Sequence, residues 1–177
     1  MHDQSFLNEY FSQHWQPTTD AFTYSAYSAV AAKIQPHEEV LDVGCGSNPF
    51  KALLPRVTGI DPAFDQADIK CTIESFRPMK LYDVALCLGS INFGDHTVIN
   101  RQIAKVIDCL KPQSRVYWRL NPGRTDHANT ECHAVPFYPW THEKLRKLAL
   151  YHGFEQSNEQ TEGNDRVQRL YAEWHRG

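Results

Sequence analysis

Apolar and aromatic side chains recur at helical spacing at the start of the chain. Between Phe6 and Trp15 they fall three or four positions apart, and Pro17 then ends the pattern, which predicts an amphipathic helix. Asp20 is placed to cap a second helix, over about Ala21–Ile34, because a short acidic side chain accepts hydrogen bonds from the free amides of a first turn. We expect the aromatic face of the first helix to cover another part of the molecule.

From residue 39 onward the pattern changes to short apolar runs bounded by turn residues. Runs of this length and composition are typical of strands buried on both faces, as in a parallel sheet. The runs predicted to be strands are Glu39–Val43, Arg56–Ile60, Asp68–Ile73, Tyr82–Leu88 and Arg115–Leu120. Helical or turn segments separate them, and this alternation predicts a doubly wound α/β sheet.

The C-terminal half of the chain combines two helices with a terminal hairpin. An apolar face over Val98–Leu110 predicts one helix, and Thr141 is placed to cap another that ends at about His152. Two further strands, Phe154–Gln160 and Arg166–Trp174, flank a turn-rich segment and predict a closing hairpin. The long loop at residues 124–140 is expected to face the substrate.

Composition favours one domain, 1–177, in the cytoplasm. The length of 177 residues fits a single core, and a formal net charge of −3 provides no basic stripe, so nucleic acid is not favoured as a partner. The five cysteines are odd in number and mostly lie in apolar stretches, which fits free thiols in a reducing compartment. No apolar stretch approaches the roughly 20 residues of a membrane span, and no targeting signal is visible, so no membrane partner is expected.

The strongest chemical signal is the run Asp42-Val43-Gly44-Cys45-Gly46 at the end of the first predicted strand. Glycines tolerate positive φ and carry no Cβ, so this backbone can approach a ligand closely. Asn48 is placed to cap the short helix that follows, with Pro49 at its first position. Asp61 ends the second predicted strand, where a carboxylate can accept hydrogen bonds from ribose hydroxyls. A dinucleotide site would have a third glycine at position 49, so Pro49 disfavours a nicotinamide cofactor.

These residues resemble the class I S-adenosylmethionine-dependent methyltransferases, and the resemblance spans roughly residue 39 to the C-terminus. The segments that carry it are Val40–Gly46, Thr58–Asp61, Tyr82–Ser90, Leu110–Pro112 and Pro139–Thr141. Two further segments, Tyr117–Gly123 and Asp126-His127, look like the small methyltransferase-like proteins encoded by tailed phages.

The resemblance implies a Rossmann-like, doubly wound sheet of seven strands, with a reversed final strand and helices on both faces. It also implies that S-adenosylmethionine binds over the carboxyl ends of the strands, with S-adenosylhomocysteine as product and no metal. Asp42 would steady the glycine turn near the sulfonium, and Asp61 would hold the ribose. The full set of residues assigned to the cofactor in this way is Asp42, Gly44, Cys45, Gly46, Asn48, Asp61, Pro62, Thr72, Ile73, Leu88, Gly89 and Ser90.

The sequence leaves the catalytic residues open. Methyl transfer from a sulfonium depends mainly on holding donor and acceptor in line, so a dedicated catalytic residue is not obligatory. Where the acceptor must lose a proton, His127 and His133 are candidate general bases, although both also suit a solvated loop. Asn92 is a further candidate. Arg119 is either a clamp for an anionic acceptor or the partner of Glu173 in an ion pair.

The sequence therefore predicts an S-adenosylmethionine-dependent methyltransferase with an unidentified, small-molecule acceptor. The length leaves no room for a separate substrate domain. Residues 1–35 would cover the cofactor site, with Tyr10, Trp15 and Tyr24 as aromatic covers. The alternative hypothesis is a regulatory protein that binds S-adenosylmethionine without catalysis.

Overall fold

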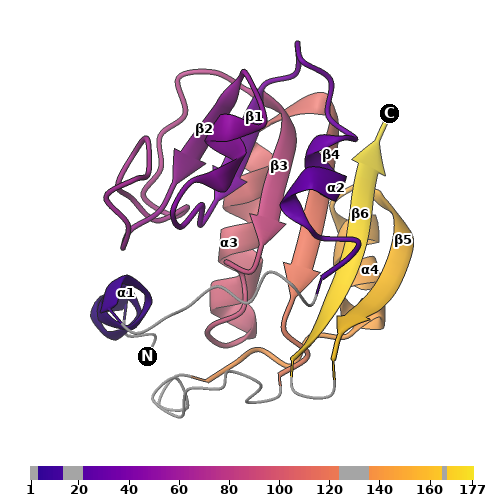
Figure 1. Cartoon of the computed structure of the whole chain (residues 1–177). Coiled ribbons are helices and arrows are strands. Elements are labelled where there is room, and N and C mark those ends of the chain that lie inside the picture. Colours follow the sequence, from indigo (N-terminus) through magenta and orange to yellow (C-terminus); the bar gives the residue numbers. More distant parts are fainter. Residues whose placement is uncertain (1–3, 14–21, 124–135, 165–166) are drawn as a thin grey trace.

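A computed structural model describes residues 4–13, 22–123, 136–164 and 167–177, which form a six-stranded sheet in the order β2-β1-β3-β4-β6-β5 (Figure 1). The strands are β1 (Val40–Val43), β2 (Val57–Ile60), β3 (Tyr82–Leu88), β4 (Leu110–Leu120), β5 (Glu155–Gly163) and β6 (Gln168–Arg176). The strands from β2 to β4 pair in parallel, whereas β6 is antiparallel to both β4 and β5. The predicted α/β sheet with a reversed final strand is confirmed.

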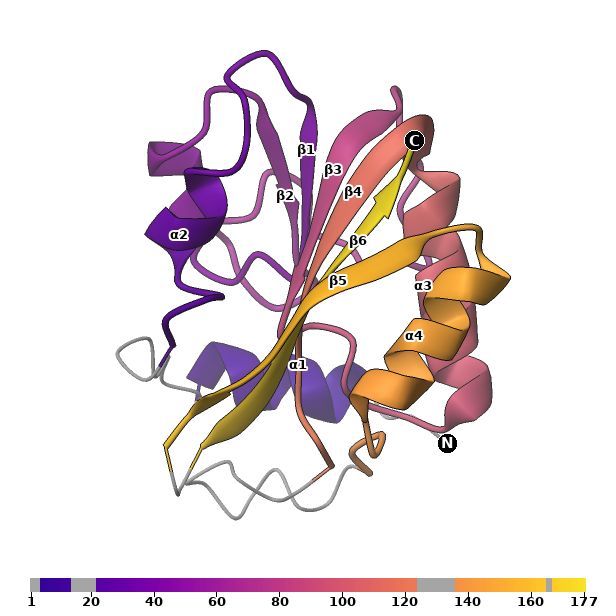
Figure 2. The same ribbon diagram turned by 90° about the vertical axis from the view of Figure 1, so that its right-hand side faces the viewer.

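Helices cover both faces of this sheet, as predicted. They are α1 (Gln4–Gln13), α2 (Tyr27–Ala31), the 3-10 helix η1 (Pro49–Ala52), α3 (His96–Asp108) and α4 (His142–Tyr151). Figure 2 shows α2 on one side of the sheet and α3 and α4 on the other. In both views α1 lies beyond the end toward which the parallel strands point. Within the described segments, no helix is long and apolar enough to span a membrane.

The central strands are buried on both faces, in agreement with their continuous apolar runs. In β1, Val40 packs in the cluster that contains α2 and η1, whereas Leu41 packs in the cluster that contains α3 and α4. Side chains alternate between the two faces along a strand, so Asp42 lies on the α2 face. In β4, Tyr117 belongs to the α2 cluster. The same alternation places Arg119 on that face, at the carboxyl end of its strand.

The expected third strand, Asp68–Ile73, is absent, and the sheet of the described residues therefore has six strands instead of seven. In place of a strand, residues 68–73 form one isolated parallel bridge with β2, between Ile69 and Ile60. The Asp68 side chain takes the place of a ladder carbonyl, because its Oδ2 accepts a hydrogen bond from the Gly59 amide at 2.8 Å. Residues 68–70 are also exposed, so apolar packing does not hold them in a strand.

The second N-terminal helix is shorter than expected, because α2 covers Tyr27–Ala31 instead of about Ala21–Ile34. The amides of residues 23–25 donate hydrogen bonds of 2.8 to 3.2 Å to the carboxylate of Glu162, which belongs to β5. This contact holds the described residues before α2 in bends instead of a helical turn. Asp20, the predicted cap of this helix, lies outside the described residues. Thr141 caps α4 as predicted, because its side chain accepts from the Lys144 amide at 3.1 Å.

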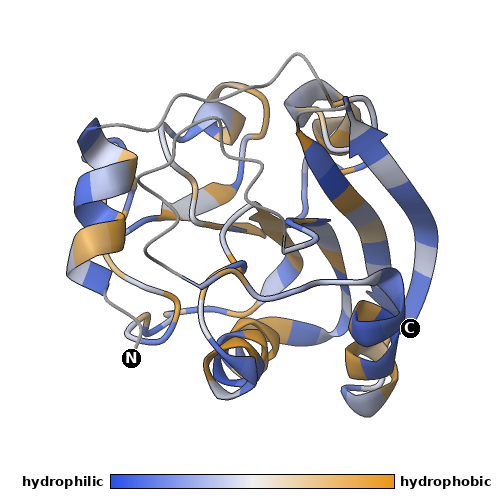
Figure 3. Cartoon of the chain, turned by 90° about the horizontal axis from the view of Figure 1, so that it is seen from below, coloured by the Kyte–Doolittle hydropathy of each residue, from blue (hydrophilic) through white to orange (hydrophobic). Residues whose placement is uncertain are grey.

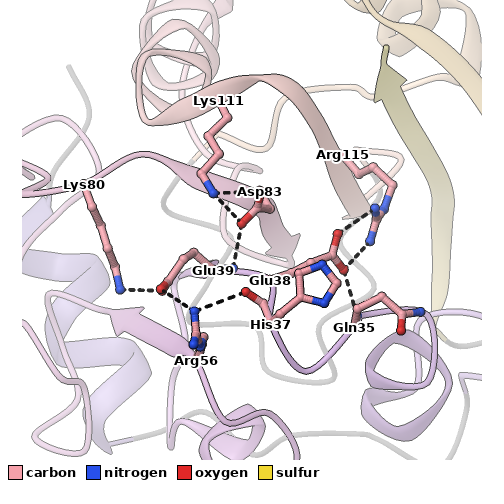
Figure 4. A network of polar contacts seen from close by, with 9 residues as sticks. All are labelled: Gln35, His37, Glu38, Glu39, Arg56, Lys80, Asp83, Lys111 and Arg115. Carbon is pink, nitrogen blue, oxygen red and sulfur yellow. Dashed lines mark hydrogen bonds and ion pairs between the residues drawn. The ribbon is translucent and has the colours of Figure 1, made fainter.

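The amino ends of the parallel strands are joined by ion pairs (Figure 4). Glu39, directly before β1, pairs with Lys80 and, at 3.5 Å, with Arg56. Asp83 of β3 accepts hydrogen bonds from Lys111 Nζ and from the Glu39 amide, both at 2.8 Å. Partial burial opposes ionisation of Asp83, yet these donors lower its pKa below the ordinary value. The network thus links β1, β3 and β4 at the end of the sheet that lies away from α1.

We predict that Asp83→Asn lowers the free energy of unfolding by about 1 kcal/mol at pH 7, because it removes a charge-assisted but partly exposed pair. The folded pKa of Asp83 is lowered, so its contribution is present above the unfolded pKa of about 3.9 and is lost as the pH falls through the folded value. Urea denaturation at pH 7 and pH 3 measures this, and the loss should be smaller at pH 3.

The control for this prediction is Glu143→Gln, which breaks an exposed pair with Lys147 on α4. That variant should unfold almost like the wild type at both pH values. An equal loss for Asp83→Asn at pH 7 and pH 3 would contradict the electrostatic role of Asp83.

Candidate functional site

The glycine turn, Gly44-Cys45-Gly46, folds back onto the end of β2. The amides of Gly44 and Cys45 donate to the Ile60 carbonyl at 2.8 and 3.0 Å. The Gly46 amide donates to Asp61 Oδ2 at 3.0 Å, while Asp61 Oδ1 accepts from two amides of the following loop at 2.8 and 3.2 Å. One carboxylate therefore organises both loops, and the structure brings the two strongest sequence signals into direct contact.

The two glycines of the turn differ in how closely other residues pack against them. Gly44 has a φ of 70°, and a Cβ at this position would lie 2.4 Å from Ser90 Cβ, so the ends of β1 and β3 touch there. Gly46 has a φ of 54°, and a Cβ there would meet no described atom within 4 Å. Packing thus requires the first glycine, whereas the second borders open space, as expected where backbone approaches a ligand.

Asn48 and Pro49 follow the glycine turn, and one of the two expectations about them is confirmed. Pro49 begins η1, as predicted. Asn48 makes no side-chain cap; it adopts the left-handed conformation with a φ of 60°. Its Nδ2 donates to the Gln66 carbonyl at 3.1 Å and toward Asp68 Oδ2 at 3.4 Å. The prediction of a side-chain cap is therefore wrong, because the loop after β2 takes up this side chain.

Asp42 presents an almost fully buried carboxyl group near the carboxyl end of β1, with 3 % of its surface exposed. Burial first, and then the neighbouring charge of Asp61, raise the pKa of Asp42 to about 7, while the charge of Arg119 acts in the opposite direction. A cation next to Asp42 would favour its ionised form. The site is therefore electrostatically suited to a positively charged group.

Asn92 ties together the ends of β3 and β4. Its Nδ2 donates to the Gly89 carbonyl at 2.9 Å, and its Oδ1 accepts from the Asn121 amide at 2.8 Å. The Asn92 carbonyl also accepts from the Tyr138 amide at 2.8 Å. Because both side-chain atoms bind backbone, Asn92 positions the loops around Gly89, which itself has a φ of 112°.

Two buried donors at these strand ends have no hydrogen-bond partner among the described residues. They are Ser90 Oγ, which follows β3, and Asn121 Nδ2, which follows β4. Buried polar atoms are normally hydrogen-bonded in folded proteins. These two atoms are therefore candidates for contact with a bound molecule.

Arg119, the candidate clamp for an anionic acceptor, is 8 % exposed. Its Nη2 donates to the Leu88 carbonyl at 2.7 Å, and its Nη1 donates to the Ser25 carbonyl at 3.3 Å. The alternative, an ion pair with Glu173, is not formed, although β4 and β6 are adjacent. In their register Tyr117 lies opposite Glu173, which makes its ion pair elsewhere.

Sequence reasoning missed Ser25 and Glu162, which complete this part of the site. Besides the amides of residues 23–25, the Glu162 carboxylate accepts a hydrogen bond from the Ser25 hydroxyl. Ser25 is fully buried, and its carbonyl is the one that Arg119 binds. No local pattern connects positions 137 residues apart, so periodicity offered no signal for this contact.

The residues expected around the adenine lie in the segments after β2. Ile73 is buried in the cluster with α3 and α4, so its side chain serves packing. Thr72 is half-buried, and its Oγ1 accepts from the Ser75 amide at 3.2 Å. Pro62 is half-buried directly after Asp61. Thr72 and Pro62 therefore retain surface for contact with a ligand.

The aromatic face of α1 packs over the loop that follows β3. Leu7 and Tyr10 are buried in a cluster with Phe93. The rings of Phe11 and Phe137 lie 5.7 and 4.7 Å from that of Phe93, measured between centroids. Figure 3 views this end of the molecule from below and shows that α1 carries both hydrophobic and hydrophilic positions. The amphipathic helix is confirmed, and it covers the carboxyl end of the sheet.

Several predicted site residues lie outside the described part of the chain, namely His127, His133, Trp15 and most of the long loop, 124–135. The described end of that loop begins at residue 136 and is anchored next to β3. Trp140 Nε1 donates to the Ile91 carbonyl there at 2.8 Å. The predicted cover Tyr24 stacks on Tyr171, with 6.1 Å between ring centroids.

Solved structures of methyltransferases share this fold. The 1,6-didemethyltoxoflavin-N1-methyltransferase of Burkholderia thailandensis gives a TM-score of 0.73 at 19 % identity, over 97 % of this chain and 88 % of that one. The magnesium protoporphyrin IX methyltransferase of Synechocystis PCC 6803 also gives 0.73, at 14 % identity over 100 % and 98 %. The N-methyltransferase NodS of Bradyrhizobium japonicum WM9 gives 0.69, at 15 % identity over 98 % and 97 %.

The chain therefore has the class I methyltransferase fold. The B. thailandensis and B. japonicum proteins were solved with S-adenosylhomocysteine and the Synechocystis protein with S-adenosylmethionine. No protein-family profile matches the sequence, and no curated protein matches it.

We predict that the two glycines differ in their effect on stability. Gly44→Ala should lower the free energy of unfolding by about 3 kcal/mol or more, because the new Cβ strikes Ser90 in addition to the strain of positive φ. Gly46→Ala should lower it by about 1 kcal/mol, the cost of positive φ alone. Urea denaturation of both variants measures the difference. Equal losses would contradict the close approach of β1 and β3.

We also predict that the buried Asp42 makes the stability of the fold depend on pH. Because the folded pKa of Asp42 is raised to about 7, the folded protein keeps a proton that the unfolded chain has released above a pH of about 3.9. The protonated Asp42 carboxyl therefore stabilises the folded state at low pH. This stabilisation is lost as the pH rises from about 3.9 to about 7, at up to about 1.4 kcal/mol per pH unit.

Asp42→Asn removes this titration, so its melting temperature should rise relative to the wild type as the pH increases from 5 to 8. Asp65→Asn is the control, because Asp65 is exposed and Lys70 lowers its pKa. Scanning calorimetry across this pH range measures both differences. A gap between Asp42→Asn and the wild type that does not change with pH would refute the buried titration.

Proposed function

We propose that this protein is an S-adenosylmethionine-dependent methyltransferase that acts on a small-molecule acceptor. The observation that carries the proposal is the contact between the glycine turn and Asp61 at the carboxyl ends of β1 and β2, with Gly46 bordering open space. Such a turn lets backbone approach an adenosine, and a carboxylate in this position can accept hydrogen bonds from the ribose. Ligands of open α/β sheets bind at this edge.

The residues at the strand ends fit the methyl donor. Asp42 places a buried carboxyl group near the end of β1, where the positive charges of the donor would be stabilised. Ser90 Oγ and Asn121 Nδ2 are buried donors with no described partner, which polar atoms of a ligand would satisfy. Gly46 leaves room for a ligand at the turn itself.

In this proposal the protein's own residues act mainly by positioning the methyl donor and the acceptor. S-adenosylmethionine, when bound, supplies an electrophilic methyl group on a positively charged sulfur. The glycine turn and Asp61 would hold the adenosine end, and Asn92 connects the loops after β3 and β4 by hydrogen bonds. Correct alignment of donor and acceptor can lower the barrier by about 7–11 kcal/mol. His127 or His133 would take a proton from an acceptor that has one to lose.

A small-molecule acceptor is supported by the related structures and by the packing of α1. The B. thailandensis protein was solved with 1,6-didemethyltoxoflavin bound, and this chain spans 88 % of its length. The aromatic cluster of α1 with Phe93 and Phe137 lies over the loop after β3 and would shield the reacting groups from water. In this proposal residues 1–35 cover the site and the loop at 124–140 borders the acceptor, all within a single domain.

Titration calorimetry with S-adenosylhomocysteine and with NAD tests the proposal. We expect saturable binding of S-adenosylhomocysteine and none of NAD. Gly46→Ala should weaken the binding at least tenfold, because its Cβ enters the open space at the turn. Absence of heat with S-adenosylhomocysteine at millimolar concentration would contradict the proposal. An acceptor screen with methyl-labelled S-adenosylmethionine then separates an enzyme from a protein that only binds the cofactor.

A further inference from the structure

Arg119 is a buried cation whose described partners are neutral. Its guanidinium binds the carbonyls of Leu88 and Ser25 and approaches Ser25 Oγ at 3.5 Å. Within the described residues it makes no ion pair, and these contacts engage at most three of its five N–H groups. A buried charge is expensive unless it is paired, so this site is suited to an anion.

The position of Arg119 indicates whether the anion belongs to the methyl donor or to the acceptor. Arg119 lies on the same face of the sheet as Asp42, and its positive charge opposes the rise in the pKa of Asp42. A Cβ added at Gly89 would lie 3.7 Å from Arg119 Nη2, so the guanidinium stands next to the loop after β3. Asp42 and Gly89 are both residues assigned to the methyl donor, so Arg119 lies on the donor side of the site.

The charges at this edge match the donor's amino-acid end. That end carries one sulfonium, one ammonium and one carboxylate. Asp42 is the buried acid near the end of β1, Asp61 is assigned to the ribose, and Arg119 is a cation that interacts with Asp42. Opposite charges favour each other's ionised form, so Asp42 suits the positive groups and the guanidinium suits the carboxylate.

Glu162 orients Arg119 from outside the donor site. Its carboxylate binds three successive amides at residues 23–25 and the Ser25 hydroxyl, which makes the Ser25 carbonyl a rigid acceptor. Phe22, next to this segment, places its ring 4.8 Å from the Arg119 guanidinium. The guanidinium is thus held between the Ser25 and Leu88 carbonyls, which limits its rotation and leaves its remaining donors for a ligand.

We propose that Arg119 binds the carboxylate of the methyl donor, and that Glu162 is a positioning residue that acts through Ser25. This inference rests on the proposed function. It replaces the idea that Arg119 clamps an anionic acceptor, because the guanidinium lies with Asp42 and Gly89 on the donor side.

Calorimetry with S-adenosylmethionine and decarboxylated S-adenosylmethionine tests the inference, since the two ligands differ by the carboxylate. The wild type should bind S-adenosylmethionine about 10- to 100-fold more tightly, as expected for a charge-assisted hydrogen bond. Arg119→Gln should bind both ligands with nearly equal affinity. Arg115→Gln is the matched control on the same strand, where Arg115 pairs with Glu38 at the amino end, and it should keep the wild-type ratio.

A wild-type ratio near one would overturn the inference without any variant, so the test does not depend on whether Arg119→Gln folds. An unchanged ratio in Arg119→Gln would overturn it as well, and would return Arg119 to the acceptor side. If the wild type binds neither ligand, the proposed function itself fails, which is a different outcome from a ratio near one.

Glu162→Gln tests the positioning role. This variant keeps the shape of the side chain and loses its charge, so the ratio should fall several-fold toward one. Glu159→Gln on the same strand breaks an exposed pair with Arg146 and should keep the wild-type ratio. A lower melting temperature for Glu162→Gln with an unchanged ratio would show that Glu162 holds the fold and does not position Arg119.

Discussion

The candidate site depends on the hydrogen bonds that fold the glycine turn back onto the end of β2. Gly44 and Cys45 share the Ile60 carbonyl, and Gly46 is bound by Asp61. Gly44 also touches Ser90, so the ends of β2, β1 and β3 are held at one place. Since parallel strands carry their carboxyl ends to the same edge, this contact gathers the acids, the turn and the loops at the edge where open α/β sheets bind ligands.

Burial explains which elements were predictable from the sequence. The strand over Tyr82–Leu88 has the predicted bounds, because its side chains pack on both faces and the apolar run records this directly. The strand β1, the amphipathic α3 and the terminal hairpin were also predicted, with bounds that differ by one to three residues. Thr141 was identified as a cap from its position alone, because a cap acts on backbone close to it in sequence. The ribose role of Asp61 stays a prediction.

The features that sequence did not predict are contacts between a carboxylate and distant backbone. The Asp68 carboxylate accepts from the Gly59 amide, where a strand carbonyl was expected, and Glu162 accepts from amides in the segment where a longer second helix was expected. Neither contact changes the periodicity of apolar residues. The general bases at His127 and His133 and the resemblance to phage-encoded proteins stay predictions.

The proposed function requires a methyl donor to lie across the carboxyl ends of β2, β1 and β3. A crystal structure of the protein grown with S-adenosylhomocysteine measures this most directly. We predict that the ribose hydroxyls lie within hydrogen-bond distance of Asp61 and that the amino-acid end lies between Gly44 and Arg119. Ligand density elsewhere, or a ligand at this edge that contacts neither Asp61 nor the glycine turn, would contradict the proposed donor site.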